Sequence, residues 1–419
     1  MRVNRRTALQ TFAGAGAGLT LSSPRPLCLE AEALAMQSPT PALEPFRIDY
    51  GAEVIDDLHQ RLDRVRWPEM PFDPGWSTGT SDGVLRELVD YWRNEYDWFA
   101  VQDELNRLDH RLALVDGERL HCVLYDAQSA GDVADVPLLL LHGWPGSFHE
   151  FGRGAERLRT GSSDTPAFNL VVPSLPGFAF SDAPQSPGVH AGVMADRLHT
   201  LMRQLGHERY GVQGGDWGAI IGNQMALKYP DALVGLHLNF IPGGLSPLPD
   251  GVEPGAEEQA YRAFRARFGA TETGYSAVQT TRPQSLAYAQ QDSPVGWLAW
   301  MLEKYWAWSD HDEDIWNTFS RDDLLTTAML YWLPGRVLSA ARIYYETVNA
   351  APGGLVGGRV ETPTGYARFP AEPWGPPREM VERRFNLVHY SEPTQGGHFP
   401  ALEQPEIWSG EVSAFFGGL

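Results

Sequence analysis

Three side chains in this sequence have types and an order that could carry out covalent hydrolysis. Asp216 stands in the run 214–218, Gly-Gly-Asp-Trp-Gly. Further along the chain come a carboxylate, Glu372, and a histidine, His398, which follows two glycines. A carboxylate can attack an electrophilic carbon to form an ester on the enzyme, and a histidine supported by a second carboxylate can activate water to hydrolyse that ester.

The sequence around Asp216 predicts a strand, a sharp turn and a helix. Residues 209–213 have the pattern of a short strand, and residues 219–229 that of a helix closed by Pro230. Such a turn needs small neighbours, because a Cβ atom there would clash. The arrangement resembles the nucleophile elbow of α/β-hydrolases, in which esterases carry Ser instead of Asp. The alternative is an ordinary glycine-rich turn with an N-cap Asp.

The surrounding pattern predicts the α/β-hydrolase fold, a mostly parallel twisted sheet with helices on both faces. Residues 111–125 form a hairpin with an Asp-Gly turn, and strands follow at 137–141, 168–173 and 232–239, with a helix at 189–205. The carboxyl ends of parallel strands meet at one edge of the sheet, where we expect the site.

The loop 142–147, His-Gly-Trp-Pro-Gly-Ser, directly follows the first buried strand. In α/β-hydrolases this loop supplies one backbone N–H of the oxyanion hole. Here the donors would be Trp144 and Trp217, and they would stabilise negative charge on the ester carbonyl. A tight Gly/Pro turn without a catalytic role is the alternative.

Two late strands, 361–369 and 385–390, lead into Glu372 and His398. Both side chains would then reach the edge that carries Asp216. The sequence leaves other carboxylates open as partners of the histidine: Glu346, Glu361, Glu379 and Glu403.

Between the sheet-forming halves, the sequence predicts a helical lid rich in aromatic side chains. The domain organisation that follows is an export peptide at 1–35, an N-terminal helical domain at 36–110, core halves at 111–240 and 351–419, and the lid at 241–350. Tyr275 and Tyr344 in the lid are candidate donors to a developing alkoxide, because a phenol stays neutral at pH 7. By the sequence pattern alone, the alternative is that either tyrosine is an ordinary core or surface residue of the lid.

The N-terminus resembles a twin-arginine export signal. Arg5-Arg6 precedes a weakly apolar, Gly/Ala-rich stretch, and Ala33-Leu34-Ala35 offers a cleavage site. We expect an exported protein, periplasmic or secreted, whose mature chain starts near Met36. The apolar stretch is far shorter than the ~20 residues of a transmembrane helix. A disordered, mildly basic N-terminus is the alternative.

Composition argues against nucleic-acid or anionic membrane partners. Lys and Arg number 33 and Asp and Glu 53, which gives a net charge of −20. The chain has two cysteines, Cys28 and Cys122, and this number argues against a disulfide framework and a cysteine-based metal site. The sequence leaves a homo-oligomer open.

Taken together, these motifs resemble the microsomal type of epoxide hydrolase, which includes the juvenile-hormone epoxide hydrolases. The resemblance covers about residues 46–404 and rests on these runs: 142–147 His-Gly-Trp-Pro-Gly-Ser, 215–218 Gly-Asp-Trp-Gly, 292–296 Asp-Ser-Pro-Val-Gly, 369–372 Phe-Pro-Ala-Glu and 396–399 Gly-Gly-His-Phe. It implies an enzyme that converts a small apolar epoxide and water to a vicinal diol, without cofactor or metal. The mammalian member's membrane anchor is replaced here by the apparent export signal.

The resemblance also implies a role for each candidate residue. Asp216 would be the nucleophile, His398 the base and Glu372 its acid partner. Tyr275 and Tyr344 would open the ring, although Tyr345 is an adjacent alternative to Tyr344. The rival functions are a haloalkane dehalogenase with the same Asp nucleophile and a non-catalytic ligand-binding α/β-hydrolase.

Overall fold

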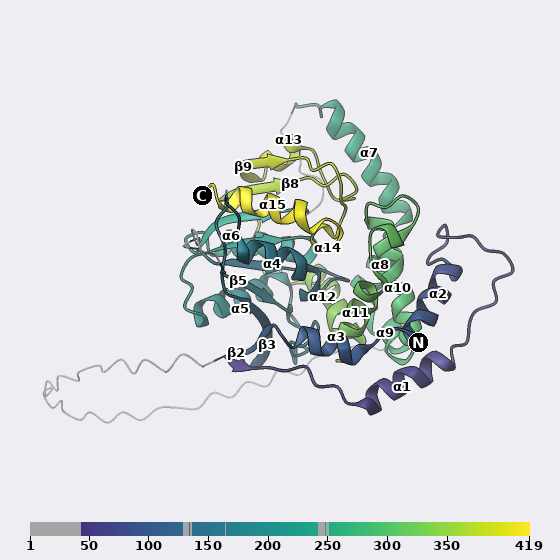
Figure 1. Ribbon diagram of the computed structural model, residues 1–419. Coiled ribbons are helices and arrows are strands. Elements are labelled where there is room, and N and C mark those ends of the chain that lie inside the picture. Colours follow the sequence, from purple (N-terminus) through teal and green to yellow (C-terminus); the bar gives the residue numbers. More distant parts are fainter. Residues whose placement is uncertain (1–42, 129–133, 135, 164, 242–247, 249–250) are drawn as a thin grey trace, which may run out of the picture. The chain divides into compact units, whose positions relative to one another are not determined.

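The computed structural model describes residues 43–419 except 129–133, 135, 164, 242–247 and 249–250. The predicted export signal and its cleavage site lie outside the described residues. In the described part, the chain forms a central sheet with helices on both of its faces, as predicted (Figure 1).

Among the described residues, the sheet has nine strands in the order β1-β2-β3-β5-β4-β6-β7-β8-β9. The strands from β5 to β9 in this order pair in parallel, whereas β1, β2 and β3 pair antiparallel with their neighbours. The strand bounds are β1 Glu44–Pro45, β2 Asp109–Val115, β3 Glu118–Tyr125, β4 Leu138–Leu141, β5 Leu170–Pro173, β6 Tyr210–Gly214, β7 Leu233–Leu238, β8 Val360–Ala367 and β9 Phe385–Ser391.

The predicted hairpin is confirmed. Strands β2 and β3 pair from end to end, and the turn between them places Asp116 at φ 51° and Gly117 at φ 82°. Two consecutive positive φ values match the twist of antiparallel strands, and Asp-Gly is a favoured sequence for such a turn. Strand β1 was not predicted, because it consists of only two residues beside the hairpin.

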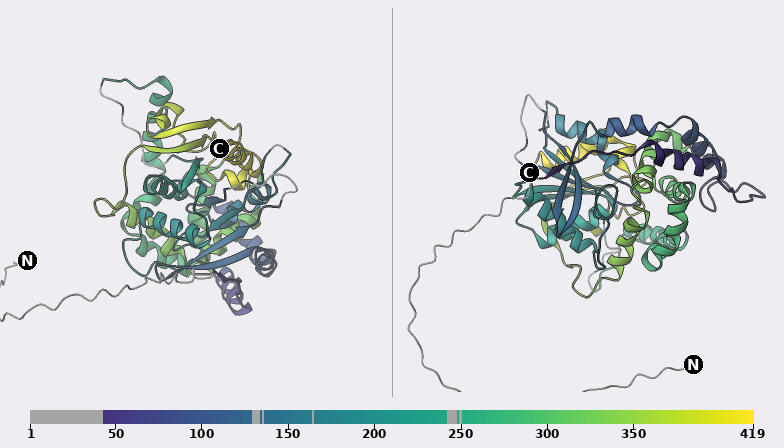
Figure 2. Two further views of the ribbon diagram at one scale, coloured as in Figure 1. Left: turned by 90° about the vertical axis from the view of Figure 1, so that its left-hand side faces the viewer. Right: turned by 90° about the horizontal axis from the view of Figure 1, so that it is seen from below.

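Helices pack in pairs on the two faces of the sheet (Figures 1 and 2). One face carries α4 (Gly152–Thr160) and α15 (Pro405–Phe416); the other carries α5 (Ala191–Gln204) and α6 (Asp216–Lys228). Strand β4 between them is buried at every residue, as expected for a strand covered on both faces. Two short helices, α13 (Arg378–Glu382) and α14 (Pro400–Glu403), complete the C-terminal part.

Helices α7 to α12 lie between β7 and β8 in the chain and form the lid region (Figure 1). Their bounds are α7 Ala256–Thr271, α8 Gly274–Thr281, α9 Pro283–Asp292, α10 Pro294–Trp308, α11 Arg321–Trp332 and α12 Val337–Val348. Helix α8 has no clear apolar stripe in its Ser- and Thr-containing sequence, so periodicity alone does not predict it. A 3₁₀ turn, η2 (Ile315–Asn317), lies between α10 and α11.

The N-terminal helices α1 (Ala52–Asp63), α2 (Asp82–Asn94) and α3 (Trp98–Leu105) lie beside the lid helices (Figure 1). Trp76, in the loop between α1 and α2, stacks on Trp306 of α10 with ring centroids 4.4 Å apart. Arg61 donates hydrogen bonds to the carbonyl and carboxylate oxygens of Asp292, just before α10. These contacts join the N-terminal segment to the lid.

The run 292–296 is thereby explained as a structural motif. Ser293 accepts a hydrogen bond from the N–H of Gly296 at 3.0 Å and so caps α10, while Pro294 occupies the first helical position. Its residues hold the lid in place and supply no reacting group. Within the part of the chain that the structure describes, no helix is long and apolar enough to cross a membrane.

Candidate active site

Asp216 lies at the tip of the turn that joins β6 to α6. Its φ angle is 46°, in the left-handed region that a residue with a side chain rarely adopts. The helix cap is Gly215, and no side chain caps this helix, so the alternative interpretation of Asp216 as an ordinary N-cap is wrong. A Cβ atom at Gly218 would overlap the carbonyl group of Leu141, which explains why this helix needs a glycine to approach β4.

The Asp216 carboxyl group is held by the loop after β4. The backbone N–H of Trp144 donates a hydrogen bond to its Oδ1 atom at 2.8 Å. Gly143 precedes this donor, and a Cβ atom there would overlap the Asp216 side chain. The loop therefore commits one carboxylate oxygen to a backbone donor and leaves Oδ2 as the oxygen free to attack.

Trp217, the second predicted donor, follows Asp216 in the first turn of α6. Its indole ring packs edge-on against the ring of Tyr344, with centroids 4.7 Å apart. Trp217 therefore lies in the site. Among the hydrogen bonds of the described residues, the one from these two donors to the Asp216 carboxylate comes from the backbone N–H of Trp144.

His398 and Glu372 meet beside Asp216. The Nδ1 atom of His398 donates to Oε2 of Glu372 at 2.8 Å, and both side chains are at most 1% exposed. Trp374 donates its backbone N–H to the other oxygen of Glu372 at 2.9 Å. The second ring nitrogen, Nε2, lies 3.6 Å from Oδ2 of Asp216, beyond hydrogen-bond length. Nε2 therefore faces Asp216 without a hydrogen bond to it.

The charge state of His398 follows from these neighbours. Burial disfavours the charged imidazole, but the carboxylates of Glu372 and Asp216 outweigh it and raise the pKa of His398 to about 10. The resting site therefore holds a protonated histidine between two carboxylates. Loss of the Asp216 charge would return the imidazole toward the neutral form that a base requires.

The structure shows which of the candidate carboxylates is the partner of His398. Glu361 and Glu379 are exposed, and Glu346 binds Arg342 and the N–H of Gly188. Glu403 accepts the backbone N–H groups of three residues around the histidine: Asp310, Gly397 and Phe399. Glu403 thus fixes the loop, while Glu372 contacts the imidazole itself.

Tyr275 and Tyr344 lie together over Asp216, although they come from the separate helices α8 and α12. Their ring centroids are 5.9 Å apart. The ring of Trp144 stacks on Tyr275, with an interplanar angle of 5°, and meets Tyr344 edge-on. Tyr344 is 5% exposed whereas Tyr345 is 38% exposed, so the structure places Tyr344 and not its neighbour at the site.

Both phenols remain protonated at neutral pH. Burial raises the pKa of Tyr275, and the Asp216 carboxylate adds to the effect. Burial also raises the pKa of Tyr344 well above its ordinary value, with Tyr275 and Asp216 contributing. Two neutral O–H donors therefore stand where an alkoxide oxygen would develop.

Two further residues at this site were missed by the sequence analysis. Glu150 lines a small cavity beside Asp216 and His398. The buried Lys304 places its ammonium group 4.8 Å from the centre of the Tyr275 ring. Glu150 lies three residues after the loop 142–147. The closeness of this carboxylate to the loop in sequence could have identified it as a candidate site residue.

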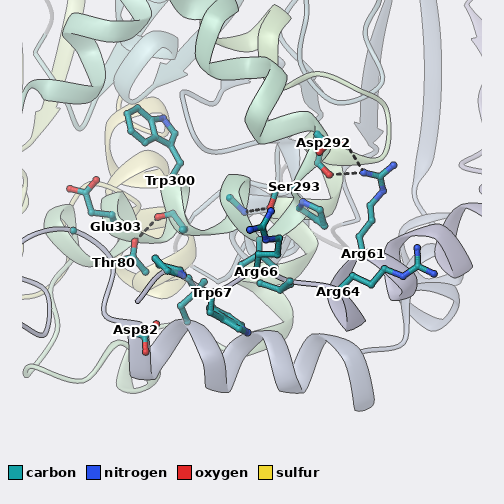
Figure 3. Close-up of a pocket in the computed structure, with 18 of the residues that line it drawn as sticks. Arg61, Arg64, Arg66, Trp67, Thr80, Asp82, Asp292, Ser293, Trp300 and Glu303 are labelled. Carbon is teal, nitrogen blue, oxygen red and sulfur yellow. Dashed lines mark hydrogen bonds and ion pairs between the residues drawn. The ribbon is translucent and has the colours of Figure 1, made fainter. Parts of the chain in front are cut away.

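A larger groove, of about 950 Å³, lies elsewhere, between α1, the loop after it and α10 (Figure 3). Arg61, Trp67 and Trp300 line it, together with the Asp292–Ser293 segment. None of the predicted site residues is among the described residues that line this groove. In the described part of the chain, no group of His, Cys, Asp and Glu side chains is placed to hold a metal ion.

Comparison with known proteins agrees with this geometry. The model of the epoxide hydrolase N terminus matches residues 43–151, and that of the alpha/beta hydrolase fold matches residues 136–293. Epoxide hydrolase 1 of Sus scrofa is 33% identical, over 90% of this chain and 89% of that protein. The juvenile hormone epoxide hydrolase of Bombyx mori is 33% identical, over 88% of this chain and 86% of that protein.

Solved structures give the same result. The crystal structure of the Bombyx mori enzyme superposes with a TM-score of 0.79 at 31% identity and covers 90% of this chain and 94% of its own. The Aspergillus niger epoxide hydrolase superposes with a TM-score of 0.79 at 29% identity, covering 90% and 96%. The chain belongs to the epoxide hydrolase family of the α/β-hydrolase fold.

Proposed function

We propose that this enzyme hydrolyses an epoxide to a vicinal diol through a covalent ester on Asp216. The observation that carries the proposal is the gathering of two neutral phenols, Tyr275 and Tyr344, around Trp144, whose backbone N–H binds the Asp216 carboxylate. Opening an epoxide requires a nucleophile at carbon and a proton donor at oxygen. Asp216 supplies the nucleophile, and the two tyrosines supply the donors.

In the first step, Oδ2 of Asp216 attacks one epoxide carbon and the carbon–oxygen bond of the ring breaks. Tyr275 and Tyr344 donate hydrogen bonds to the departing oxygen, and one of them passes its proton to it. The proton that His398 loses when the Asp216 charge disappears returns to that tyrosine, so the step ends with a hydroxyl group, two neutral phenols and a neutral imidazole. The raised pKa values of the two tyrosines keep the donors protonated until charge develops on the departing oxygen.

In the second step, water adds to the carbonyl carbon of the ester. Neutral His398, oriented by Glu372, takes a proton from this water, and the Trp144 N–H stabilises the resulting oxyanion at Oδ1. The intermediate then expels the diol oxygen, which takes up a proton, and the Asp216 carboxylate is restored.

The test uses trapping of the intermediate. His398→Gln should form the ester with styrene oxide and fail to hydrolyse it, so that intact-mass spectrometry records the protein plus one substrate. In the wild type, repeated turnover in ¹⁸O-water should label the Asp216 carboxylate. Turnover without label in that peptide would overturn the ester mechanism.

The phenols also separate this function from dehalogenation. A departing halide accepts hydrogen bonds but no proton, whereas an alkoxide needs both. We therefore expect styrene oxide to be consumed and a bromoalkane to release no bromide. Saturable binding of an epoxide without diol formation would support the ligand-binding alternative instead.

We further propose that the protein is exported in folded form. The support is the Arg5-Arg6 pair, the apolar stretch after it and the Ala33-Leu34-Ala35 site. Replacing both arginines with lysine should abolish delivery across the membrane, and unchanged delivery would refute the proposal.

A further inference from the structure

A small cavity lies against the Asp216 carboxyl group, behind the loop that follows β4. Its lining includes Glu150, Asp216, Asn239 and His398. The volume of the cavity that the centre of a water molecule can occupy is about 10 Å³. One buried water needs ~10–15 Å³ of such space and two to four polar partners. The cavity therefore has the size and the lining for a single water molecule.

The cavity is distinct from the space in which the epoxide would react. Tyr275 and Tyr344 are not among the described residues that line it. Asp216 and His398 border it and are also the two groups that the hydrolytic step requires. A water molecule in this cavity would lie against the Asp216 carboxyl group on a side that neither tyrosine lines.

Glu150 comes from the 3₁₀ turn η1 (Phe148–Phe151), and the sequence before it makes room for its carboxyl group. A Cβ atom at Gly146 would overlap Oε2 of Glu150, so only glycine there lets the carboxyl group lie against the loop. The backbone N–H of Ser147 also bonds to this carboxyl group. The loop thus holds Glu150 in one position.

Burial raises the pKa of Glu150 to about 8, while the charge on His398 opposes this effect and the charge on Asp216 adds to it. Near pH 7 the group is therefore mostly a neutral acid. A neutral carboxyl group can accept a hydrogen bond from water and does not compete with His398 for the proton.

We propose that Glu150 and His398 together hold the water molecule that hydrolyses the Asp216 ester. This inference rests on the proposed function and assigns a residue to its second step. One proton of the water points to Nε2 of His398 and the other to Glu150, so that the oxygen lone pair faces the carbonyl carbon. The oxygen bonds to that carbon, Nε2 takes the first proton, and the ester bond to the diol oxygen then breaks with return of the proton to it.

The test compares Glu150→Leu, which keeps the bulk but removes the polar group, with Glu150→Gln, which keeps an acceptor. The two steps are measured separately after rapid mixing with styrene oxide. Trp fluorescence reports the rate of ester formation, and single-turnover kinetics report the rate of ester hydrolysis. Glu118→Gln is the matched control, since Glu118 begins β3, its side chain is 13% exposed, and it forms an ion pair with Arg197 of α5.

We expect Glu150→Leu to slow ester hydrolysis by about 10²-fold, on the scale of losing one positioned hydrogen-bond partner. Ester formation should change less than about threefold, Glu150→Gln should restore most of the hydrolysis rate, and Glu118→Gln should match the wild type. Wild-type ester hydrolysis in Glu150→Leu, or equal slowing of both steps, would overturn the inference. A wild type that forms no ester would instead overturn the proposed function.

Discussion

The imidazole Nε2 of His398 lies 3.6 Å from Oδ2 of Asp216. This separation is too long for a hydrogen bond but short enough for strong electrostatic coupling. The charge on Asp216 therefore controls the charge on His398. In the proposed mechanism, ester formation would remove the Asp216 charge and so prepare His398 to accept a proton.

The first prediction tests this coupling. Asp216→Asn replaces the carboxylate with a neutral amide that resembles the ester in charge, and it should lower the pKa of His398 from about 10. NMR titration of the His398 ring protons measures the shift. An unchanged pKa in this variant would show that Asp216 does not govern the histidine.

The second prediction concerns stability against pH. The folded-state pKa of His398 is raised from 6.5 to about 10, so the folded protein binds this proton more tightly than the unfolded chain. The stabilisation is complete below about pH 6.5 and is lost as the pH rises toward 10. In urea unfolding, the free-energy difference between wild type and His398→Gln should shrink from pH 6 to about pH 10.

The third prediction separates the tyrosines. Tyr275→Phe and Tyr344→Phe each remove one donor to the departing oxygen and should each slow ester formation by about 10²-fold. Tyr345→Phe is the matched control, because this neighbour is 38% exposed, and it should keep the wild-type rate. A large effect of Tyr345→Phe with none of Tyr344→Phe would reverse the assignment.

The fourth prediction concerns the loop after β4. Gly143→Ala places a methyl group where the Asp216 side chain lies, so it should displace the nucleophile and reduce turnover by more than about 10²-fold. Gly152→Ala, at the start of α4, meets no heavy atom within 4 Å and should leave turnover unchanged. Initial rates of diol formation measure both.

The fifth prediction concerns the support of the histidine loop. Glu403→Gln turns an acceptor into a donor and leaves at least one of three buried N–H groups without a partner. We expect a loss of about 1–3 kcal/mol in the free energy of unfolding, with a lower kcat. Glu361→Gln, at an exposed side chain, should change neither quantity. Equal stability of both variants would exclude this role for Glu403.

The sequence alone determined the kind of chemistry and the sheet that carries it. Glycines around Asp216, a buried apolar run before His142 and the strands before Glu372 and His398 are local signals, because turn and strand geometry depend on neighbouring residues. The hairpin at Asp116-Gly117 was predictable for the same reason. Helix α8 was not, since tertiary packing and not its own sequence pattern stabilises it.

Only the tertiary structure decided which side chains meet. It chose Glu372 over Glu403 as the partner of His398, and Tyr344 over Tyr345, because burial and distance depend on residues far apart in the chain. It also placed Glu150 beside the nucleophile in a cavity that no local pattern encodes. Sequence spacing specifies the elements, and packing between them specifies the site.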